Sequence, residues 1–223
     1  MKIVIINGSP RTKGLTAAIL HSIESFLTQK NVNVMYYDLC TLNISPCIGC
    51  CNCYKTGFCH INDDAQKLSE IIQCSDGLIL GSPTYASNVS GYMKLFIDRG
   101  HFVVEQLLKD KYCTIVATGE NYGSSDTKRI LKKLILYSGG YLTQSMILNA
   151  PFNSASSISE DISKISEKSA AILFDAISAH RKKPLQSVYH QLIFYLGLKP
   201  FVIKKGLKYQ GVIDRWKDLG LII

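Results

Sequence analysis

Cysteines are the residues of this chain whose type and spacing most directly suggest chemistry. Five of the eight cysteines lie between residues 46 and 59. Four of them, Cys47, Cys50, Cys53 and Cys59, follow the spacing C-x2-C-x2-C-x5-C, and one short loop could turn their thiolates toward a single point. A cubane iron-sulfur cluster takes one thiolate per iron, so this set suits a 4Fe-4S cluster. The other interpretation left open is a cysteine-rich loop without metal beside a redox cofactor.

The same segment argues against two other uses of cysteine. Structural zinc sites usually combine two C-x2-C-like knuckles from separate places, and the second knuckle is missing. A disulfide framework is not expected in a reducing cytoplasm. Cys51 is not expected to be a ligand, because adjacent residues in a tight loop point in different directions and the i, i+3 spacing selects Cys50. The remaining cysteines lie in or beside apolar stretches and are predicted to be core thiols: Cys40, Cys74 and Cys113.

The composition predicts one α/β domain with an appendage. The chain has 223 residues, of which 47% are hydrophobic, enough for one well-buried core. No apolar run is long enough to span a bilayer and the N-terminus lacks the regions of a signal peptide, so a cytoplasmic protein is expected. The net charge is +8, of which residues 181–223 carry +7, from nine Lys and Arg against two Asp and Glu. This basic tail lacks the aromatic spacing of an RNA-binding sheet and a helix-turn-helix pattern, so no nucleic-acid partner is expected.

Hydrophobic periodicity predicts strands that alternate with helices. Buried strands are expected near residues 3–6, 32–37, 77–80, 112–118 and 141–148, and helices near residues 16–29, 63–74, 92–98, 126–137 and 159–181. Such alternation implies a parallel sheet covered on both faces by right-handed crossovers. The expected fold class is α/β, a doubly wound five-stranded parallel sheet of strand order 2-1-3-4-5.

The first strand is followed by a polar, glycine-containing loop and a helix N-terminus, a geometry that collects a phosphate. Unpaired N–H groups in the first helical turn and the helix dipole stabilise an anion there. Ser9 and Thr16 could add hydroxyl donors, and Arg11 a charge-assisted pair. The loop is not a Walker A motif, because Gly14 is followed by Leu15 rather than Lys, and it is not G-x-G-x-x-G either, which disfavours ATP and dinucleotides. An ordinary strand-to-helix turn is the alternative.

Three polar loops, after the first, third and fourth strands, would lie at the same carboxyl edge of the sheet. In the order 2-1-3-4-5 the first and third strands flank the switch point, where such folds bind a mononucleotide. The loops therefore predict a flavin mononucleotide (FMN) site. Tyr85 would cover the isoalloxazine ring, and backbone groups near Asn88 and Gly119 could reach its polar edge.

Several motifs together resemble a known family. They are Gly8-Ser9-Pro10-Arg11 with Gly14-Leu15-Thr16, Gly81-Ser82-Pro83-Thr84-Tyr85, and Ser90-Gly91-Tyr92-Met93-Lys94 with Phe96-Ile97-Asp98-Arg99. Over about residues 1–180 the chain resembles the NADPH-dependent FMN reductase group of flavodoxin-like proteins, and with the cysteine motif it is similar to the iron-sulfur flavoprotein branch. The resemblance implies two sets of FMN-binding residues: Ser9, Arg11, Leu15, Thr16 and Ala17 at the phosphate, and Pro83, Thr84, Tyr85, Asn88 and Val89 at the flavin. Gly14 and Gly119 complete the predicted cofactor site. The resemblance also implies a 4Fe-4S cluster on Cys47, Cys50, Cys53 and Cys59.

Two functional classes follow from these observations. The favoured one is an FMN-dependent oxidoreductase in which NAD(P)H or reduced ferredoxin delivers electrons, and a redox partner protein or a small molecule accepts them. FMN accepts two electrons and can release them singly, so a nearby cluster would make the protein a two-to-one electron converter. The alternative is a non-enzymatic flavin- or metal-binding carrier or sensor. No side chain is required as an obligatory acid or nucleophile, so no catalytic residue is predicted.

The predicted domains are an FMN-binding domain of residues 1–183, with the cysteine loop at residues 46–60, and a basic, partly helical extension of residues 184–223. The extension carries an apolar helical stripe made of Val188, Tyr189, Leu192, Ile193 and Leu196. Such a stripe more often packs on its own domain or on a neighbouring subunit than on a membrane. A homodimer or homotetramer is expected, in which the extension or the cysteine loop meets the partner, and membrane association is the disfavoured alternative.

Overall fold

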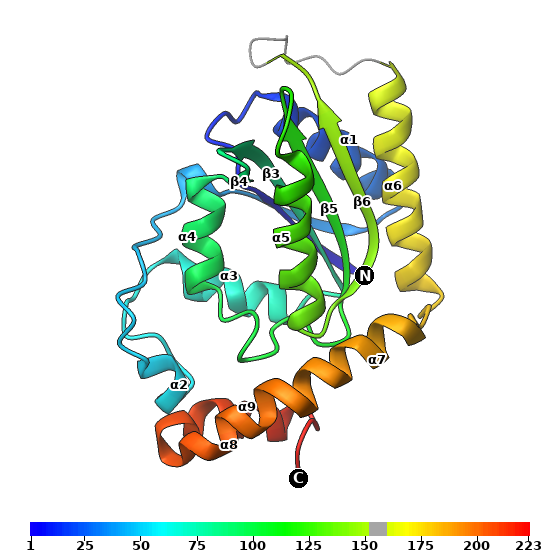
Figure 1. Cartoon of the computed structure of the whole chain (residues 1–223). Coiled ribbons are helices and arrows are strands. Elements are labelled where there is room, and N and C mark those ends of the chain that lie inside the picture. The colour runs from blue at the N-terminus through cyan, green and yellow to red at the C-terminus, as the bar shows by residue number, and fades with distance from the viewer. Residues whose placement is uncertain (152–159) are drawn as a thin grey trace.

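The computed structural model describes residues 1–151 and 160–223. Five parallel strands form its central sheet (Figure 1): β1 (Lys2–Asn7), β2 (Asn33–Asp38), β3 (Gly77–Tyr85), β5 (Tyr112–Gly119) and β6 (Tyr141–Asn149). They lie in the order β2-β1-β3-β5-β6, and a short strand, β4 (Asn88–Val89), pairs antiparallel with the end of β3. The predicted order 2-1-3-4-5 is confirmed, because β5 and β6 are the fourth and fifth parallel strands.

The central strands are buried on both faces, which explains their continuous apolar runs. In β1 the side chains from Ile3 to Ile6 are fully buried. This strand pairs in parallel with β2 on one side and β3 on the other. β-branched residues suit such a pleated surface when helices cover it on both sides.

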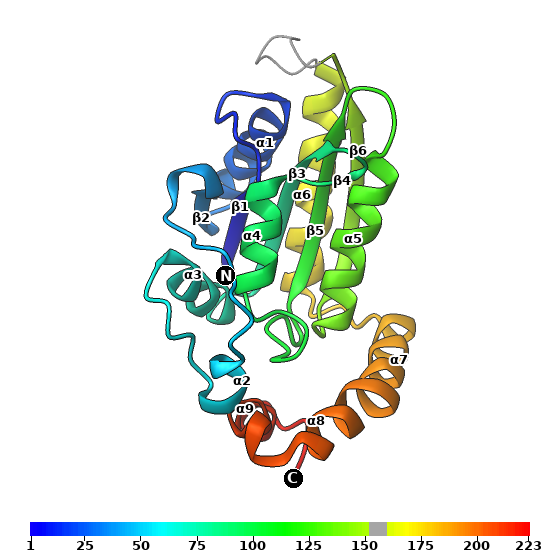
Figure 2. The same cartoon turned by 60° about the vertical axis from the view of Figure 1, so that its left-hand side comes forward.

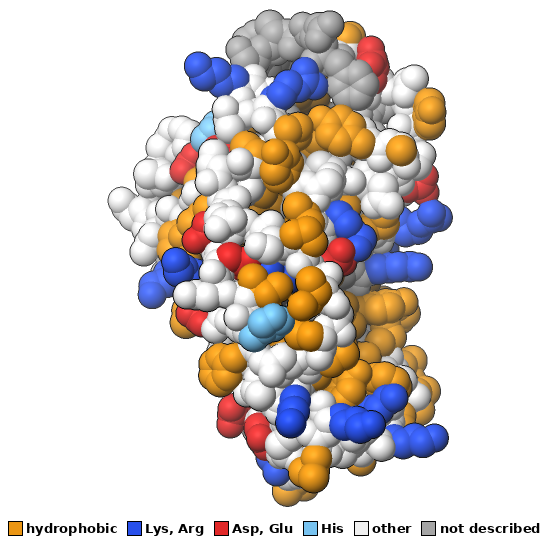
Figure 3. Space-filling model, turned by 90° about the vertical axis from the view of Figure 1, so that its left-hand side faces the viewer, with side chains coloured by type: hydrophobic (Ala, Val, Ile, Leu, Met, Phe, Trp, Pro, Cys, Tyr) orange, Lys and Arg blue, Asp and Glu red, His pale blue; other side chains and the backbone are white. Residues whose placement is uncertain are grey.

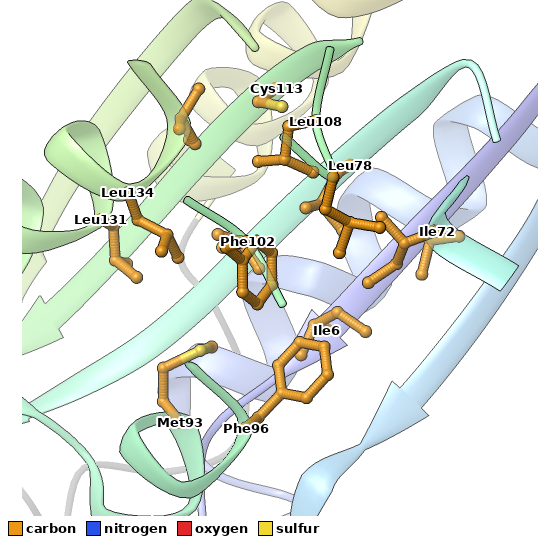
Figure 4. Packing of buried hydrophobic residues seen from close by; sticks show 14 of the residues in the cluster. Ile6, Ile72, Leu78, Met93, Phe96, Phe102, Leu108, Cys113, Leu131 and Leu134 are labelled. Carbon is orange, nitrogen blue, oxygen red and sulfur yellow. The ribbon is translucent and has the colours of Figure 1, made fainter. Parts of the chain in front are cut away.

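Helices cover the two faces of the sheet, as Figure 2 shows. The first face carries α1 (Leu15–Gln29) and α6 (Glu160–Ser178), which pack against each other. The predicted start of α6 at residue 159 lies outside the described residues. The opposite face carries α3 (Asp64–Gln73), α4 (Gly91–Arg99) and α5 (Ser124–Tyr137), whose apolar side chains meet those of the strands (Figure 4).

The third strand is longer than its apolar run predicts. Residues 81–85 were expected in a polar loop, but β3 continues through them to Tyr85. They are mostly buried, and their polar groups find partners: the Ser82 hydroxyl accepts a hydrogen bond from the Ser90 amide at 3.0 Å and donates one to the Pro83 carbonyl at 2.8 Å. Pairing with β5 extends to Pro83 and Thr118. Satisfied hydroxyls thus allow a polar sequence to continue a buried strand.

The extension, residues 184–223, folds into a chain of helices below the sheet (Figures 1 and 2). It consists of α7 (Pro184–Ile193), a π-helical segment (Phe194–Leu198), α8 (Lys199–Lys205), a 3-10 segment (Gly206–Tyr209) and α9 (Gln210–Asp218). Its own small core is fully buried and contains Phe194, Val202, Val212 and Trp216. The Trp216 indole donates a hydrogen bond of 2.8 Å to the Val104 carbonyl. The extension is therefore tied to the turn that follows α4.

Most of the apolar stripe of the extension does not pack on this domain. Val188, Leu192 and Leu196 are 54%, 53% and 75% exposed. These residues do not pack on their own domain, so of the two predicted partners of the stripe only a neighbouring subunit remains for them. The adjacent Phe194 is instead fully buried in the small core of the extension. Within the described residues, no helix combines the length and the hydropathy needed to cross a membrane.

The cysteines outside the cysteine loop differ in burial. Cys113 is buried in β5, as predicted, and burial raises the pKa of its thiol to about 12. Cys74 is exposed because it ends α3, and Cys40 is only partly buried. The prediction of a core thiol is thus correct for Cys113 and wrong for Cys74.

Candidate functional site

The loop between β1 and α1 presents an uncapped helix N-terminus. Gly14 precedes the first turn in an extended conformation, and among residues 1–151 and 160–223 no side chain caps it. The buried Ser9 side chain shapes the loop, since its hydroxyl accepts from the Arg11 amide and donates to the Arg11 carbonyl, both at 3.1 Å. The Thr16 hydroxyl bonds to the hydroxyl of Thr118 at 2.7 Å. The loop therefore offers an anion chiefly the amides of the first turn of α1 and the Arg11 side chain.

A tight hairpin turn joins β3 to β4 beside this loop. Its central residues, Ala86 and Ser87, have φ angles of 48° and 57°, a left-handed conformation that is costly for residues other than glycine. The turn is supported from below: Thr84 donates to the Thr127 hydroxyl at 3.0 Å, which in turn donates to the Asn88 carbonyl at 2.9 Å. The turn holds the partly buried Tyr85 and the exposed Asn88 at the carboxyl edge of the sheet.

The structure brings most of the predicted phosphate residues around one hollow. Its lining combines the β1–α1 loop with the ends of β3, β5 and β6: Ser9, Arg11, Gly14, Leu15, Thr16, Pro83, Thr118, Gly119, Ala150 and Pro151. Ala17 is fully buried and does not line the hollow, and Thr84 and Val89 are buried in the hairpin. We call the hollow and the adjacent hairpin the flavin edge.

Three lining residues were not predicted from the sequence. Thr118, Ala150 and Pro151 line the hollow because β5 and β6 end at the same carboxyl edge as β1. Each lies at the end of an expected strand or shortly after it, and this position in the sequence could have indicated that they line the site. The donor set fits FMN, because an uncapped helix N-terminus and an arginine suit a phosphate dianion and a hairpin with a tyrosine suits a planar ring.

The cysteine loop, residues 46–60, lies at the opposite edge of the sheet. It is anchored at Arg99, the last residue of α4, whereas α4 begins at Gly91 beside the flavin edge. Nine helical residues span about 13 Å. Within one chain the cysteine loop and the flavin edge therefore lie at opposite ends of α4 (Figure 1).

A buried ion pair closes the base of the cysteine loop. The Arg99 guanidinium bonds to both carboxylate oxygens of Asp63, at 2.8 and 2.9 Å, and both side chains are 2% exposed. The same guanidinium donates to the carbonyls of Ser45 (2.8 Å) and Ile61 (3.3 Å), the residues that bracket the loop. Burial alone would raise the pKa of Asp63, but bonds from Arg99 and from the amides of Ser45 and Ala65 hold it below its usual value. We call Arg99 and Asp63 the clamp.

Three of the four predicted cluster ligands have a cationic or N–H neighbour. The Cys50 thiol lies 3.3 Å from Nδ1 of His60. Cys59 interacts with the Arg99 guanidinium. Cys53 interacts with His101: burial lowers the pKa of that imidazole, but bonds to Cys53 and Glu105 outweigh this and raise it to about 10. Positive neighbours favour the thiolate, which is the form that binds metal.

Cys51 has a different environment from the predicted ligands. Its backbone is left-handed, with a φ angle of 58°, and its thiol donates to the Gly49 carbonyl at 3.5 Å. It is thus turned toward the backbone of its own loop. Cys47 is exposed, and Cys53 and Cys59 are partly buried. The four predicted thiols fit a cubane, because they come from one anchored loop and three of them lie beside cationic or N–H groups. Cys51 is the thiol of this loop that we do not assign as a ligand.

Helix α9 packs directly on the cysteine loop. The loop contains a short helix, α2 (Asn52–Thr56), which contacts α9. The backbones approach so closely that a Cβ on Gly211 would lie 2.1 Å from the Gly57 nitrogen, and the rings of Tyr54 and Tyr209 stack at 4.8 Å. The extension is therefore part of the environment of the cysteines.

These features define a flavodoxin-like α/β protein with an added cysteine site. Solved structures of similar fold include an NADH:FMN oxidoreductase in its apo form (TM-score 0.60, 18% identity, covering 83% of this chain and 93% of that one). A flavodoxin from Archaea is also similar (TM-score 0.56, 13% identity, covering 80% and 99%).

The sequence comparisons are more specific. The family model for NADPH-dependent FMN reductase matches residues 1–154, and the chain belongs to this family. An iron-sulfur flavoprotein of Clostridioides difficile (strain 630) is 38% identical over 227 residues, covering all of both chains. An iron-sulfur flavoprotein of Archaeoglobus fulgidus is 28% identical over 231 residues, again with full coverage of both.

Proposed function

We propose that this chain is a cytoplasmic FMN-dependent oxidoreductase that transfers electrons from NAD(P)H or reduced ferredoxin to an acceptor, and that it carries a 4Fe-4S cluster. The observation that carries the proposal is the pair of prepared sites at opposite ends of α4. One is an uncapped helix N-terminus beside Arg11 in a hollow, and the other is an anchored loop with four suitably spaced thiols. The acceptor is either a redox protein or a small molecule.

At the flavin edge the role of the chain is to bind FMN and to orient its ring. The amides of the first turn of α1 and the Arg11 side chain would hold the phosphate, while Ser9 and Thr16 fix the loop through their own bonds. The strained hairpin holds Tyr85 at the carboxyl edge of the sheet, where its side chain would cover the flavin ring. Bound FMN supplies an acceptor of two electrons that can be released one at a time. No acid or nucleophile of the protein is needed for this chemistry.

At the cysteine loop the chain supplies four thiolates, Cys47, Cys50, Cys53 and Cys59. The cationic neighbours offset their negative charge, and the clamp keeps the two ends of the loop together. A bound cluster supplies a one-electron carrier.

The separation of the two sites supports a homodimer or homotetramer. About 13 Å of helix lie between the flavin edge and the clamp of one chain, and the two cofactors would come closer if the cysteine loop of one copy faced the flavin edge of another. Ile48 and Phe58 of the loop are 68% and 65% exposed, and hydrophobic side chains are visible on the lower part of this side of the molecule, bordered by Lys and Arg (Figure 3). Exposed apolar groups on the cysteine loop and on the extension suit a protein partner.

Turnover separates an oxidoreductase from a flavin carrier or sensor. The FMN-loaded protein is mixed with NADH or NADPH and a quinone or dye acceptor, and the oxidation of the nucleotide is followed. In a second assay reduced ferredoxin replaces the nucleotide as the donor. Sustained oxidation over many equivalents supports the proposal. A single stoichiometric reduction, or none with any donor, would identify a carrier or sensor.

A further inference from the structure

A second set of metal-type ligands lies beside the cysteine loop. In the described part of the chain, Cys53, His101 and Glu105 are the one group of three His, Cys, Asp or Glu residues whose ligand atoms all lie within 4.8 Å of one another. The four predicted cluster cysteines do not form such a group. A cubane does not require its ligand atoms to lie this close together, because they bind four different irons.

The backbone brings this group together from two distant elements. Cys53 belongs to α2, and His101 and Glu105 belong to the turn that follows α4. His101 has a left-handed φ of 57°, an uncommon conformation for a residue other than glycine. Its Nδ1 lies 2.5 Å from the Glu105 carboxylate, and the two side chains are only 11% and 13% exposed. The pair is therefore held in place and sheltered from bulk water.

We propose that Cys53, His101 and Glu105 form a mononuclear site for a divalent cation of borderline softness, such as zinc or ferrous iron, which is filled when no cluster occupies Cys53. A thiolate, an imidazole and a carboxylate are a donor set that such cations accept, and three protein ligands with one open position are typical of reactive zinc sites. The cation replaces the thiol proton and the proton that His101 shares with Glu105, so binding releases protons.

A cavity of about 360 Å³ adjoins this site. His101 and Glu105 both line it, together with Cys59 from the loop and Asp214, Arg215 and Asp218 from α9. Water or a small ligand in this cavity can complete the coordination. The extension thus forms one wall of the cavity.

The two metal sites share Cys53 and cannot be filled together. Zinc should therefore compete with assembly of the cluster, whereas a zinc site built from the four cysteines would make no use of His101 or Glu105. The zinc site itself does not depend on the proposed function, because it concerns the chain without its cluster.

Zinc binding by the cluster-free, full-length protein tests the inference. A chromophoric chelator competes for the metal, and the variants are Cys53→Ser, His101→Ala and Glu105→Gln. We expect one equivalent of zinc in the wild type, and at least about a tenfold loss of affinity in each variant. The matched controls are His60→Ala, beside Cys50, and Cys51→Ser, which should bind zinc like the wild type. FMN content and circular dichroism confirm that each variant is folded.

Cobalt substitution identifies the ligands independently. A thiolate-to-cobalt absorption band of single-thiolate intensity should appear and should vanish in Cys53→Ser, but persist in Cys47→Ser. The inference is overturned if the wild type binds no zinc, or if His101→Ala binds it as tightly as the wild type. It is also overturned if the cobalt band has the intensity of several thiolates. None of these results depends on whether the protein assembles a cluster or oxidises NAD(P)H.

Discussion

Replacing Arg99 by methionine removes the clamp while keeping much of the side-chain volume. Arg99 and Asp63 are each 2% exposed, so the substitution leaves a buried carboxylate without its cation, and the carbonyls of Ser45 and Ile61 lose their donor. Breaking a buried pair by removing one partner costs about 3–5 kcal/mol. Because Asp63 keeps bonds from the amides of Ser45 and Ala65, we expect the lower end of this range. A loss of about 3 kcal/mol corresponds to roughly a hundredfold change in the folding equilibrium.

Urea unfolding followed by circular dichroism measures this loss, with Arg129→Met as the matched control. Arg129 also bonds to an aspartate, Asp126 at 2.7 Å, but these side chains are 69% and 37% exposed. An exposed pair contributes only about 0.2–1 kcal/mol. Since the clamp joins the two ends of the cysteine loop, Arg99→Met should also lose iron more than FMN. Equal losses of stability in the two variants would refute the assignment of the clamp.

The clamp also predicts an acid dependence of stability. The pKa of Asp63 in the folded chain lies below its usual value, so its stabilisation is complete above about pH 4 and is lost as the pH falls through the folded pKa. The wild type should therefore lose free energy of unfolding below pH 4. In Arg99→Met burial would raise the pKa of Asp63, and the acid loss should be smaller. Identical slopes in urea titrations of the two proteins at several acid pH values would contradict this explanation.

Further predictions concern cofactor, extension and assembly. Arg11→Ala should weaken FMN binding by about 1.5–3 kcal/mol through the loss of a charge-assisted phosphate contact, measured by titration of the apoprotein; equal affinities would place the phosphate elsewhere. Gly211→Ala should lower the melting temperature, because its Cβ would lie 2.1 Å from the Gly57 nitrogen, whereas Gly197→Ala, with no atom within 4 Å, should not; equal melting curves would show that α9 does not rest on the loop as described. Light scattering at micromolar concentration should return a dimer or tetramer, and a monomer mass would rule out the proposed assembly.

The features that follow from short sequence patterns are predictable. Continuous β-branched runs such as Ile3 to Ile6 reveal the covered strands, and a polar glycine-containing loop before an amphipathic helix reveals the phosphate site. The hairpin at Ala86 and Ser87 was missed, because neither residue type signals a left-handed backbone. Hydroxyl pairing within the fold, not local composition, lets β3 continue to Tyr85.

The position of the cysteine loop depends on long-range contacts that no local pattern reveals. Asp63 and Arg99 lie 36 residues apart, and each looks like an ordinary charge at a helix end. Gly57 and Gly211 are far apart in the sequence, and only the folded structure shows their close approach. For the same reason His101 and Glu105 could not be recognised as neighbours of Cys53 from the sequence.

The most direct test of the account is the content of iron, acid-labile sulfide and FMN in protein reconstituted anaerobically. For the wild type and for Cys51→Ala we predict one FMN with about four irons and four sulfides per chain, since one cubane uses four other thiolates. Cys50→Ala, at the position next to Cys51, should keep its FMN and lose most of its iron. Wild-type protein that binds FMN but no iron under these conditions would contradict the cluster, and loss of iron in Cys51→Ala with iron retained in Cys50→Ala would contradict the choice of ligands.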